Sequence, residues 1–149
     1  MNINVYTIIN NPLPELYSIK NFDVNLNEFN YDEDIVKMLN KNLKMDKLSS
    51  EHIYALGLNY NMIPKGIIQV SIGNNYESNV DIRDLATGLL LIGAEQFMMF
   101  HNHPSGNKEV SIHDKILTSK YIEVGDLIGI SFIRHLMITE NYYCKCEEV

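Results

Sequence analysis

Residues 101–114 have the sequence HNHPSGNKEVSIHD, which sets two histidines, a serine and an aspartate at a fixed spacing. Residues two apart in a β-strand point to the same face, so the side chains of His101 and His103 can reach one ion. A proline and a glycine then turn the chain, and a helix that begins near Ser111 can bring Asp114 back to the histidines. Two imidazoles and a carboxylate suit a catalytic zinc, which keeps its fourth position open for water.

This motif resembles the JAMM (MPN+) metalloprotease motif, and its first part, HNHPSG, is similar to the RadC-like branch of that superfamily. The resemblance extends over about residues 48–149. It implies an α/β fold of the JAMM type, a cytidine-deaminase-like mixed β-sheet flanked by helices. It also implies that His101, His103 and Asp114 hold Zn²⁺.

The resemblance implies two catalytic residues as well. Glu51 opens a predicted strand, as the catalytic glutamate of the family does, and it can accept a proton from water and deliver it to a leaving amine. Ser111 can donate a hydrogen bond to the oxyanion of a tetrahedral intermediate. Serine is also a common helix N-cap, and we expect one hydroxyl not to serve both roles easily. If Glu51 is not the base, the next candidates are Glu77 and Glu95.

Other positions match the RadC-like branch less completely. Arg83 and His135 fall where that branch has an arginine and a histidine. His135 is either a hydrogen-bonding neighbour of the site or a satisfied core histidine. We expect His113 to face solvent, His52 to be incidental and Asn102 to be structural. Departures from the branch occur at Asp81, Ile82, Asp84, Val110 and Arg134.

The composition indicates one folded domain, because 46% of the 149 residues are hydrophobic and 21% are charged. A formal net charge of −7 argues against tight sequence-independent binding to nucleic acid, which depends on Lys and Arg neutralising phosphates. The first residues lack the features of a signal peptide, and no apolar stretch is long enough to span a bilayer. We therefore expect a cytoplasmic protein with no membrane partner. Cys144 and Cys146 are predicted to be plain strand residues, with half a metal site or a strained disulfide as alternatives.

Hydrophobic periodicity predicts the regular elements of the chain. Helical spacing predicts helices over residues 32–47, 81–93 and 111–124, with Asp81 as a cap of the second and Gly125 as the stop of the third. Strands are predicted over residues 51–59, 66–73, 96–100, 128–138 and 142–147, the first two forming an antiparallel hairpin. Residues 74–79 are predicted to be a polar loop beside the site.

Residues 1–47 are predicted to be an N-terminal extension that precedes the RadC-like JAMM domain of residues 48–149. Alternation over residues 3–9 predicts one edge strand, and the stretch that follows, with Pro12 and Pro14, is predicted to be irregular. Residues 1–30 contain one lysine and no arginine, and no Gly-x-Gly hairpin occurs in residues 1–47. We therefore expect a cover or partner-docking element here, not a DNA-binding helix-hairpin-helix domain, and we expect its first 30 residues to be dispensable for metal binding.

The residues and the chemistry that they can support leave three hypotheses for the function. The leading hypothesis is a zinc-dependent metallohydrolase that cleaves a peptide or isopeptide bond in a protein or peptide substrate. The alternatives are a DNA-repair-associated protein that acts on or near nucleic acid, and a non-catalytic interaction module. The sequence predicts neither the identity of the substrate nor the oligomeric state.

Overall fold

The computed structural model describes residues 1–73 and 80–147 of the chain. The strands within them are β1 (Asn2–Asn10), β2 (Pro14–Asp23), β3 (His52–Leu58), β4 (Pro64–Ile72), β5 (Gln96–Asn102), β6 (Ser131–Thr139) and β7 (Tyr142–Lys145). The helices are α1 (Asp32–Leu43), α2 (Ile82–Leu91) and α3 (Ile112–Ile128), and a 3-10 turn, η1 (Leu26–Glu28), precedes α1. The polar loop predicted at residues 74–79, with Glu77, lies outside the described residues.

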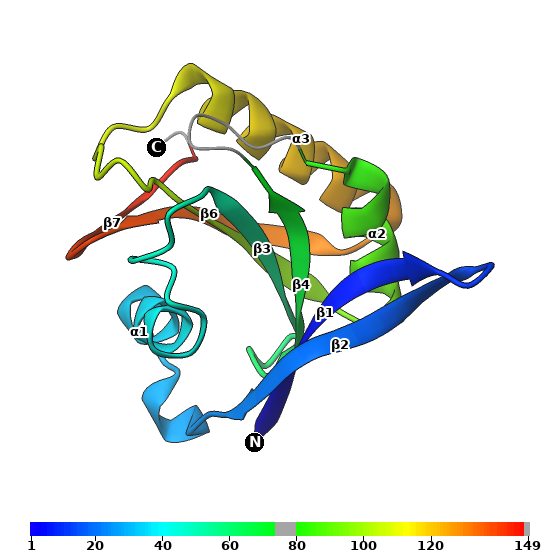
Figure 1. The fold of residues 1–149 in the computed structure, drawn as a ribbon. Coiled ribbons are helices and arrows are strands. Elements are labelled where there is room, and N and C mark those ends of the chain that lie inside the picture. The colour runs from blue at the N-terminus through cyan, green and yellow to red at the C-terminus, as the bar shows by residue number, and fades with distance from the viewer. Residues whose placement is uncertain (74–79, 148–149) are drawn as a thin grey trace.

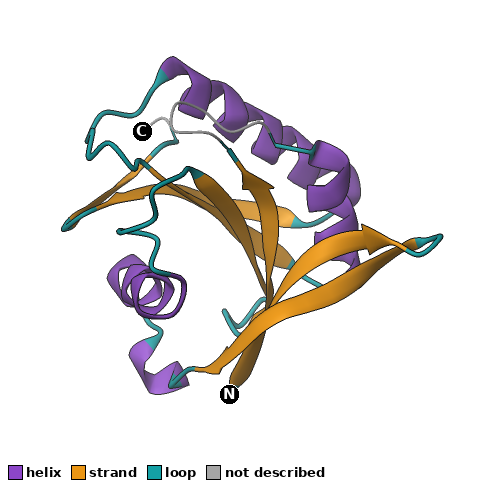
Figure 2. Ribbon diagram, in the orientation of Figure 1, coloured by secondary structure: helices purple, strands orange, loops and turns teal. Residues whose placement is uncertain are grey.

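All seven strands form one mixed sheet in the order β2-β1-β4-β3-β5-β6-β7. The sheet is strongly curved, with α1 on its concave face and α2 and α3 on the opposite face (Figure 1). β5 is antiparallel to β3 and parallel to β6, so the sheet is of the mixed kind. The colouring by secondary structure shows the resulting layers of helix, sheet and helix (Figure 2). The predicted α/β fold, a mixed sheet flanked by helices, is confirmed.

The predicted element order is confirmed from β3 to β7, including the antiparallel β3–β4 hairpin. The predicted cap of α2 is also present, because the Asp81 carboxylate accepts hydrogen bonds from the backbone N–H groups of Arg83 and Asp84 at 3.0 and 3.2 Å. α1 begins at Asp32 as predicted and ends at Leu43, four residues before the predicted end. These caps satisfy backbone groups that have no partner within the helix.

The predicted end of α3 at Gly125 is wrong, because the helix continues to Ile128 and is capped by Gly129 at φ 73°. Gly125 has a packing role. A Cβ atom at this position would lie 2.6 Å from the carbonyl oxygen of Ile130 and 3.2 Å from the ring of Phe97. The glycine therefore lets α3 approach the sheet closely, and the left-handed conformation that ends the helix occurs one turn later.

The predictions for the first 30 residues are wrong in two respects. β1 is not an edge strand, because β2 covers one side of it and β4 pairs with the other. The stretch predicted to be irregular forms β2, and Ile19 is an extra residue that bulges between the positions paired with Val5 and Tyr6. Ile3 and Val5 of β1 are buried, 2% and 1% exposed. The N-terminal segment therefore belongs to the sheet and its core. Its removal would lower the stability of the fold, which removal of a peripheral cover would not.

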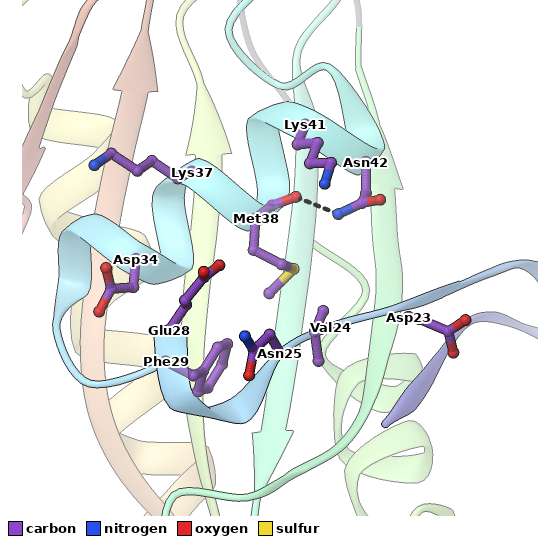
Figure 3. A pocket seen from close by; sticks show the side chains of 10 residues that line it. All are labelled: Asp23, Val24, Asn25, Glu28, Phe29, Asp34, Lys37, Met38, Lys41 and Asn42. Carbon is purple, nitrogen blue, oxygen red and sulfur yellow. Dashed lines mark hydrogen bonds between the residues drawn. The ribbon is translucent and has the colours of Figure 1, made fainter.

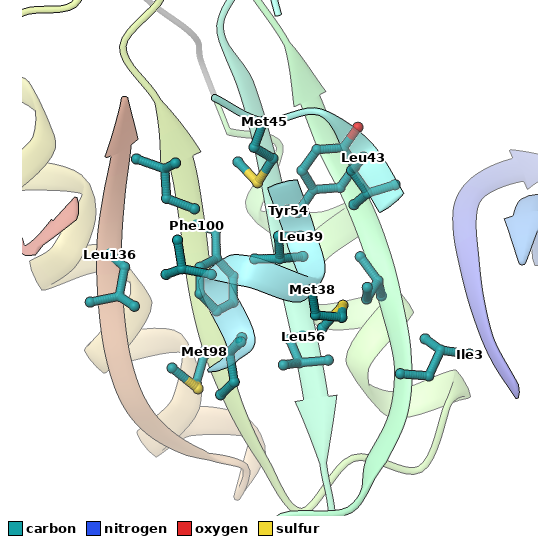
Figure 4. Close-up of a cluster of buried hydrophobic side chains, with 14 of the residues drawn as sticks. Ile3, Met38, Leu39, Leu43, Met45, Tyr54, Leu56, Met98, Phe100 and Leu136 are labelled. Carbon is teal, nitrogen blue, oxygen red and sulfur yellow. The ribbon is translucent and has the colours of Figure 1, made fainter. Parts of the chain in front are cut away.

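Two hydrophobic clusters fill the two faces of the sheet. On the concave face, Leu39 and other residues of α1 pack on alternate residues of the strands, among them Leu56 and Phe100 (Figure 4). On the other face, side chains of α2 and α3 such as Leu89 and Tyr121 complete the second cluster. No helix within the described part of the chain is long and apolar enough to cross a membrane.

Candidate metal centre

β5 brings the two histidines of the motif to the same face of the sheet. Phe97 and Met99 pack in the cluster under α2 and α3, whereas Met98 and Phe100 pack in the cluster under α1. This alternation places His101 on the α3 face. His103 follows the strand, and its backbone N–H donates to the carbonyl of Ile138 at 2.9 Å, so the strand direction continues to this residue.

The first turn of α3 holds Asp114 in place. The backbone N–H of Asp114 donates to the Ser111 hydroxyl oxygen at 3.0 Å, and the backbone N–H of Ser111 donates to Asp114 Oδ2 at 2.9 Å. This reciprocal pair is a capping box with aspartate in its second position. The N-cap role considered for Ser111 is therefore observed. Because the hydroxyl is the acceptor in this bond, its own proton is not consumed by the cap, and the oxyanion role stays a prediction.

The side chains of the three predicted ligands converge at this point. His101 Nε2 lies 3.1 Å from His103 Nε2 and 3.1 Å from Asp114 Oδ1, and His103 Nε2 lies 3.1 Å from Asp114 Oδ2. Bonds of about 2.0–2.1 Å to a tetrahedral zinc would set ligand atoms roughly 3.3 Å apart. The donor set and its spacing fit a metal ion, and this group of side chains can hold one.

Burial and mutual contact determine the electrostatics of the group. Burial lowers the pKa of His101, although the hydrogen bond with Asp114 opposes this. Burial also acts to lower the pKa of His103, but its bonds to Asp114 and to the Asn107 carbonyl outweigh burial and raise it. Burial acts to raise the pKa of Asp114, yet the two histidines hold it far below its usual value. Asp114 is therefore a carboxylate, the form in which it can bind a metal.

Glu51 lies immediately before β3 and is buried, 5% exposed. Its carbonyl accepts from the N–H of Gly73 at 2.7 Å. In the β3–β5 ladder Ile53 is opposite His101, so continuing the register by two residues sets Glu51 opposite His103 on the same face. The charge of Glu51 contributes to the raised pKa of His103, in keeping with this placement.

Asn102 joins the two strands at this point. Its side-chain carbonyl accepts from the N–H of His52 at 2.7 Å, and its amide donates to the carbonyl of Ser50 at 3.1 Å. These two bonds bracket Glu51 in the sequence. The side chain is 1% exposed. The structural role expected for Asn102 consequently includes holding the segment that carries the predicted base.

A second set of buried polar side chains lies behind the ligands. His135 Nε2 is 2.7 Å from His101 Nδ1, and His135 Nδ1 is 2.7 Å from the Thr118 hydroxyl. Burial lowers the pKa of His135 well below its ordinary value, as does the neighbouring His101. Both readings considered for His135 are therefore combined: it is a core histidine, and it is hydrogen-bonded to a predicted ligand.

The cysteines are free, so the disulfide alternative is wrong. The Cys146 side chain is 3% exposed, and burial raises the pKa of its thiol. Its sulfur lies within 4.8 Å of ring nitrogens of His101 and His135. The two rings are already hydrogen-bonded to each other, through His101 Nδ1 and His135 Nε2 at 2.7 Å.

Several other predicted positions lie apart from the ligand group. His113 is half-buried one residue before Asp114, His52 stacks on Tyr54 with ring centres 6.1 Å apart, and Arg83 is in the first turn of α2. Glu95 precedes β5 at the end opposite the histidines. A pocket of about 660 Å³ lies between the end of β2, η1 and α1, and includes none of the predicted site residues (Figure 3).

Arg134, one of the residues that depart from the RadC-like branch, has an ion-pair partner in the N-terminal part of the chain. The Arg134 guanidinium donates a hydrogen bond to the Asp32 carboxylate at the start of α1, and its Nε lies 3.6 Å from Glu147. Glu147 also accepts from the backbone N–H of His135 at 3.0 Å. Arg134 thus links the start of α1 to β6, and Glu147 links the C-terminal residues to β6 at Arg134 and His135.

The curved mixed sheet, its helices and the His-His-Asp group together define an α/β domain of the JAB type. The chain belongs to the RadC-like JAB domain family, whose model matches residues 29–148. The match begins before α1, within the segment predicted to be an extension, and the division of the chain after residue 47 stays a prediction.

Similar curated proteins carry the name UPF0758. One from Clostridium acetobutylicum is 34% identical over 110 residues, which cover 72% of this chain and 48% of that protein. One from Desulforudis audaxviator is 32% identical over 100 residues, 67% of this chain and 44% of that protein. One from Clostridioides difficile is 37% identical over 81 residues, 54% of this chain and 34% of that protein. The chain thus spans about half the length, or less, of these relatives, and their names assign no activity.

Sequence reasoning did not single out Thr118, although a signal for it was present. Thr118 follows Asp114 by four residues, so one helical face carries both. The Asn107 carbonyl, which lies 2.9 Å from His103 Nδ1, had no such signal. A backbone carbonyl is present at every residue, and only the path of the loop selects this one.

Proposed function

We propose that this chain is a zinc-dependent metallohydrolase that cleaves peptide or isopeptide bonds. The observation that carries the proposal is the convergence of His101, His103 and Asp114. The two imidazole Nε2 atoms lie 3.1 Å apart, and each lies 3.1 Å from one oxygen of the Asp114 carboxylate. These residues would hold the zinc. When bound, the ion would supply Lewis acidity that brings the pKa of a water near neutrality.

The residues of the chain supply the remaining functions. Glu51, on the same face as the ligands, accepts a proton and returns it to the leaving amine. Ser111 donates a hydrogen bond from its hydroxyl to the oxyanion, while its oxygen continues to accept the cap bond from the Asp114 backbone N–H. The N-terminal end of α3 adds a favourable dipole beside developing negative charge.

The substrate in this proposal is a protein or peptide, and the chain acts in the cytoplasm. The excess of acidic side chains, with a net charge of −7, supports a protein substrate over nucleic acid. A titration of the purified chain with duplex DNA at several salt concentrations tests this choice. Tight binding with a steep salt dependence would favour the DNA-related alternative.

The metal is tested by elemental analysis of protein purified without chelators. We expect one zinc per chain and nearly complete loss in His103→Ala. His113→Ala is the matched control, because it removes a neighbouring imidazole outside the ligand group, and it should keep the metal. Metal retention in His103→Ala would refute the ligand assignment.

The base is tested with Glu51→Gln, which preserves shape and removes the charge. We expect this variant to retain zinc and to lose hydrolysis of a quenched-fluorescent peptide library and of ε-linked lysine isopeptides by about 10²- to 10⁴-fold. Turnover equal to that of the unaltered chain would move the base elsewhere. The absence of any turnover by zinc-loaded wild-type protein on both substrate sets would favour the non-catalytic alternative.

A further inference from the structure

A closed chain of buried hydrogen bonds runs behind the candidate metal centre. It leads from His101 Nδ1 to His135 Nε2 at 2.7 Å, and from His135 Nδ1 to the Thr118 hydroxyl at 2.7 Å. The hydroxyl then bonds to the backbone carbonyl of Asp114 at 2.9 Å. The exposed fraction of each of these four residues is 4% or less. The chain therefore connects two predicted ligands through two residues that touch no metal position.

The direction of every bond follows from the carbonyl at one end. A backbone carbonyl can only accept, so the single proton of the Thr118 hydroxyl is donated to Asp114. The hydroxyl oxygen then has only lone pairs left for His135, and His135 Nδ1 must carry a proton and donate. The reverse arrangement would place two acceptors 2.9 Å apart without a proton between them, which is costly in a buried position.

The tautomer of the next histidine is then determined. The ring nitrogens of His135 face a hydroxyl and an imidazole, and burial without a carboxylate partner favours the neutral ring. A neutral ring protonated at Nδ1 has a lone pair at Nε2. His135 Nε2 therefore accepts from His101, and His101 carries its proton at Nδ1. His101 Nε2, which faces His103 and Asp114, is then the ring nitrogen left to bind an ion.

We infer that Thr118 is a positioning residue that selects, through His135, the metal-binding tautomer of His101. The inference rests on the proposed metal centre. The hydroxyl acts by keeping a proton on His101 Nδ1, so that Nε2, at the convergence of the ligand atoms, is the nitrogen that would bind zinc. A ligand held in the correct tautomer and orientation needs no rearrangement on binding, which is how outer partners raise the affinity of metal sites.

His103 reaches the same tautomer by an independent route. Its Nδ1 lies 2.9 Å from the carbonyl of Asn107, which can only accept, so this nitrogen carries a proton and Nε2 is the one that would bind zinc. The route uses the loop after β5 and does not include Thr118. His103 is consequently an internal reference: a change at Thr118 should alter the ring of His101 and leave the ring of His103 as it was.

The test compares Thr118→Val, which keeps the shape and removes the hydroxyl, with Thr118→Ser, which restores it. In the full chain, competition with a chromophoric chelator should show zinc affinity lower by about 10- to 100-fold in Thr118→Val and close to wild type in Thr118→Ser. Circular dichroism establishes that both variants are folded. Zinc affinity unchanged in a folded Thr118→Val would overturn the inference.

A second readout needs no metal. Long-range ¹H–¹⁵N spectra of the metal-free wild-type chain report which ring nitrogen carries each proton. We expect His101 and His135 to be protonated at Nδ1, and Thr118→Val to disturb both without changing His103. A proton on His101 Nε2 together with an unprotonated Nδ1 in the wild type would refute the inference even if Thr118→Val does not fold. Failure of the wild type to bind zinc would refute the proposed metal centre and leave this tautomer test standing.

Discussion

The two faces of the sheet are built from the same strands but have different contents. On the α1 face, alternate residues such as Leu56, Phe100 and Leu136 are apolar, and the polar Asn102 at the end of β5 has a structural role. On the α3 face, the apolar residues Phe97 and Met99 give way to polar ones where β5 and β6 approach the start of α3. The α1 face therefore serves the structure of the domain, and the α3 face changes from packing to chemistry within a few residues.

The comparison teaches that stability and metal binding should be separable by face. Neighbouring residues in β5 project into different surroundings, so adjacent substitutions can address the two functions in turn. The polar cluster on the α3 face is enclosed by apolar side chains, and its hydrogen bonds are worth more there than in water. Substitutions in the α1 cluster should leave those bonds intact.

The largest loss of stability should come from Phe100→Ala on the α1 face. Phe100 is fully buried, and truncation of a buried Phe costs about 3–5 kcal/mol in the free energy of unfolding. Urea denaturation measures this loss. Zinc stoichiometry of the folded fraction should stay at that of wild type, and Phe100→Leu is the milder control. A loss of zinc with the fold intact would contradict the separation of the faces.

Met99→Ala, one residue earlier, should affect both properties. Met99 is fully buried on the α3 face and lies opposite His135 in the β5–β6 ladder. The cavity should cost about 2–5 kcal/mol. It should also let His135 move and so weaken zinc binding, as a chelator competition would show. If Met99→Ala bound zinc as tightly as Phe100→Ala does, the position of His135 would not depend on the packing of Met99.

Asn102→Ala tests the residue that lies on the α1 side and yet serves the other face. It leaves the N–H of the half-buried His52 and the carbonyl of Ser50 without their present partner, at a cost of about 1–3 kcal/mol. We expect zinc to be retained and hydrolysis to fall, because the segment that carries Glu51 is released. Exposed Asn61→Ala is the control. Full hydrolytic activity in Asn102→Ala would show that Glu51 is held by other contacts.

The smallest effect is expected for Tyr121→Phe. Within the described residues, the buried Tyr121 hydroxyl has no hydrogen-bond partner, and burial raises its pKa. Removing an unsatisfied polar atom should leave the free energy of unfolding unchanged or raise it by up to about 1 kcal/mol. Thermal denaturation measures the sign. A clear loss of stability would reveal a partner for this hydroxyl.

Local patterns were sufficient for the parts of the fold that depend on neighbours in sequence. Alternation in residues 96–103 gave the correct face for both histidines, and Asp81 was recognisable as a cap from its position alone. The convergence of His101, His103 and Asp114 followed from a strand, a turn and a helix that are consecutive in the chain. The ligand group of such a site is thus determined by one short segment of the sequence.

Features that depend on distant parts of the chain were not predictable in this way. β2 is exposed on most of its length and interrupted by the bulge at Ile19, so it shows no alternation. Whether β1 is an edge strand depends on β4, some 60 residues away, and Gly125 is required by Ile130 and Phe97 across the helix–sheet contact. The hydrogen bonds of Asn102 likewise join positions about 50 residues apart.

The short contact between β1 and β4 has a consequence for motion. These strands share two register pairs, Val5 with Ile67 and Tyr6 with Ile68, whereas β1 and β2 share nine. The β1–β2 hairpin is held to the sheet chiefly by side chains such as Ile3. It can therefore open as one cooperative unit while β3, β5 and β6 stay paired. In hydrogen exchange, slow local opening would be confined to one end of the sheet, and the strands that carry the candidate ligands would open only with the whole domain.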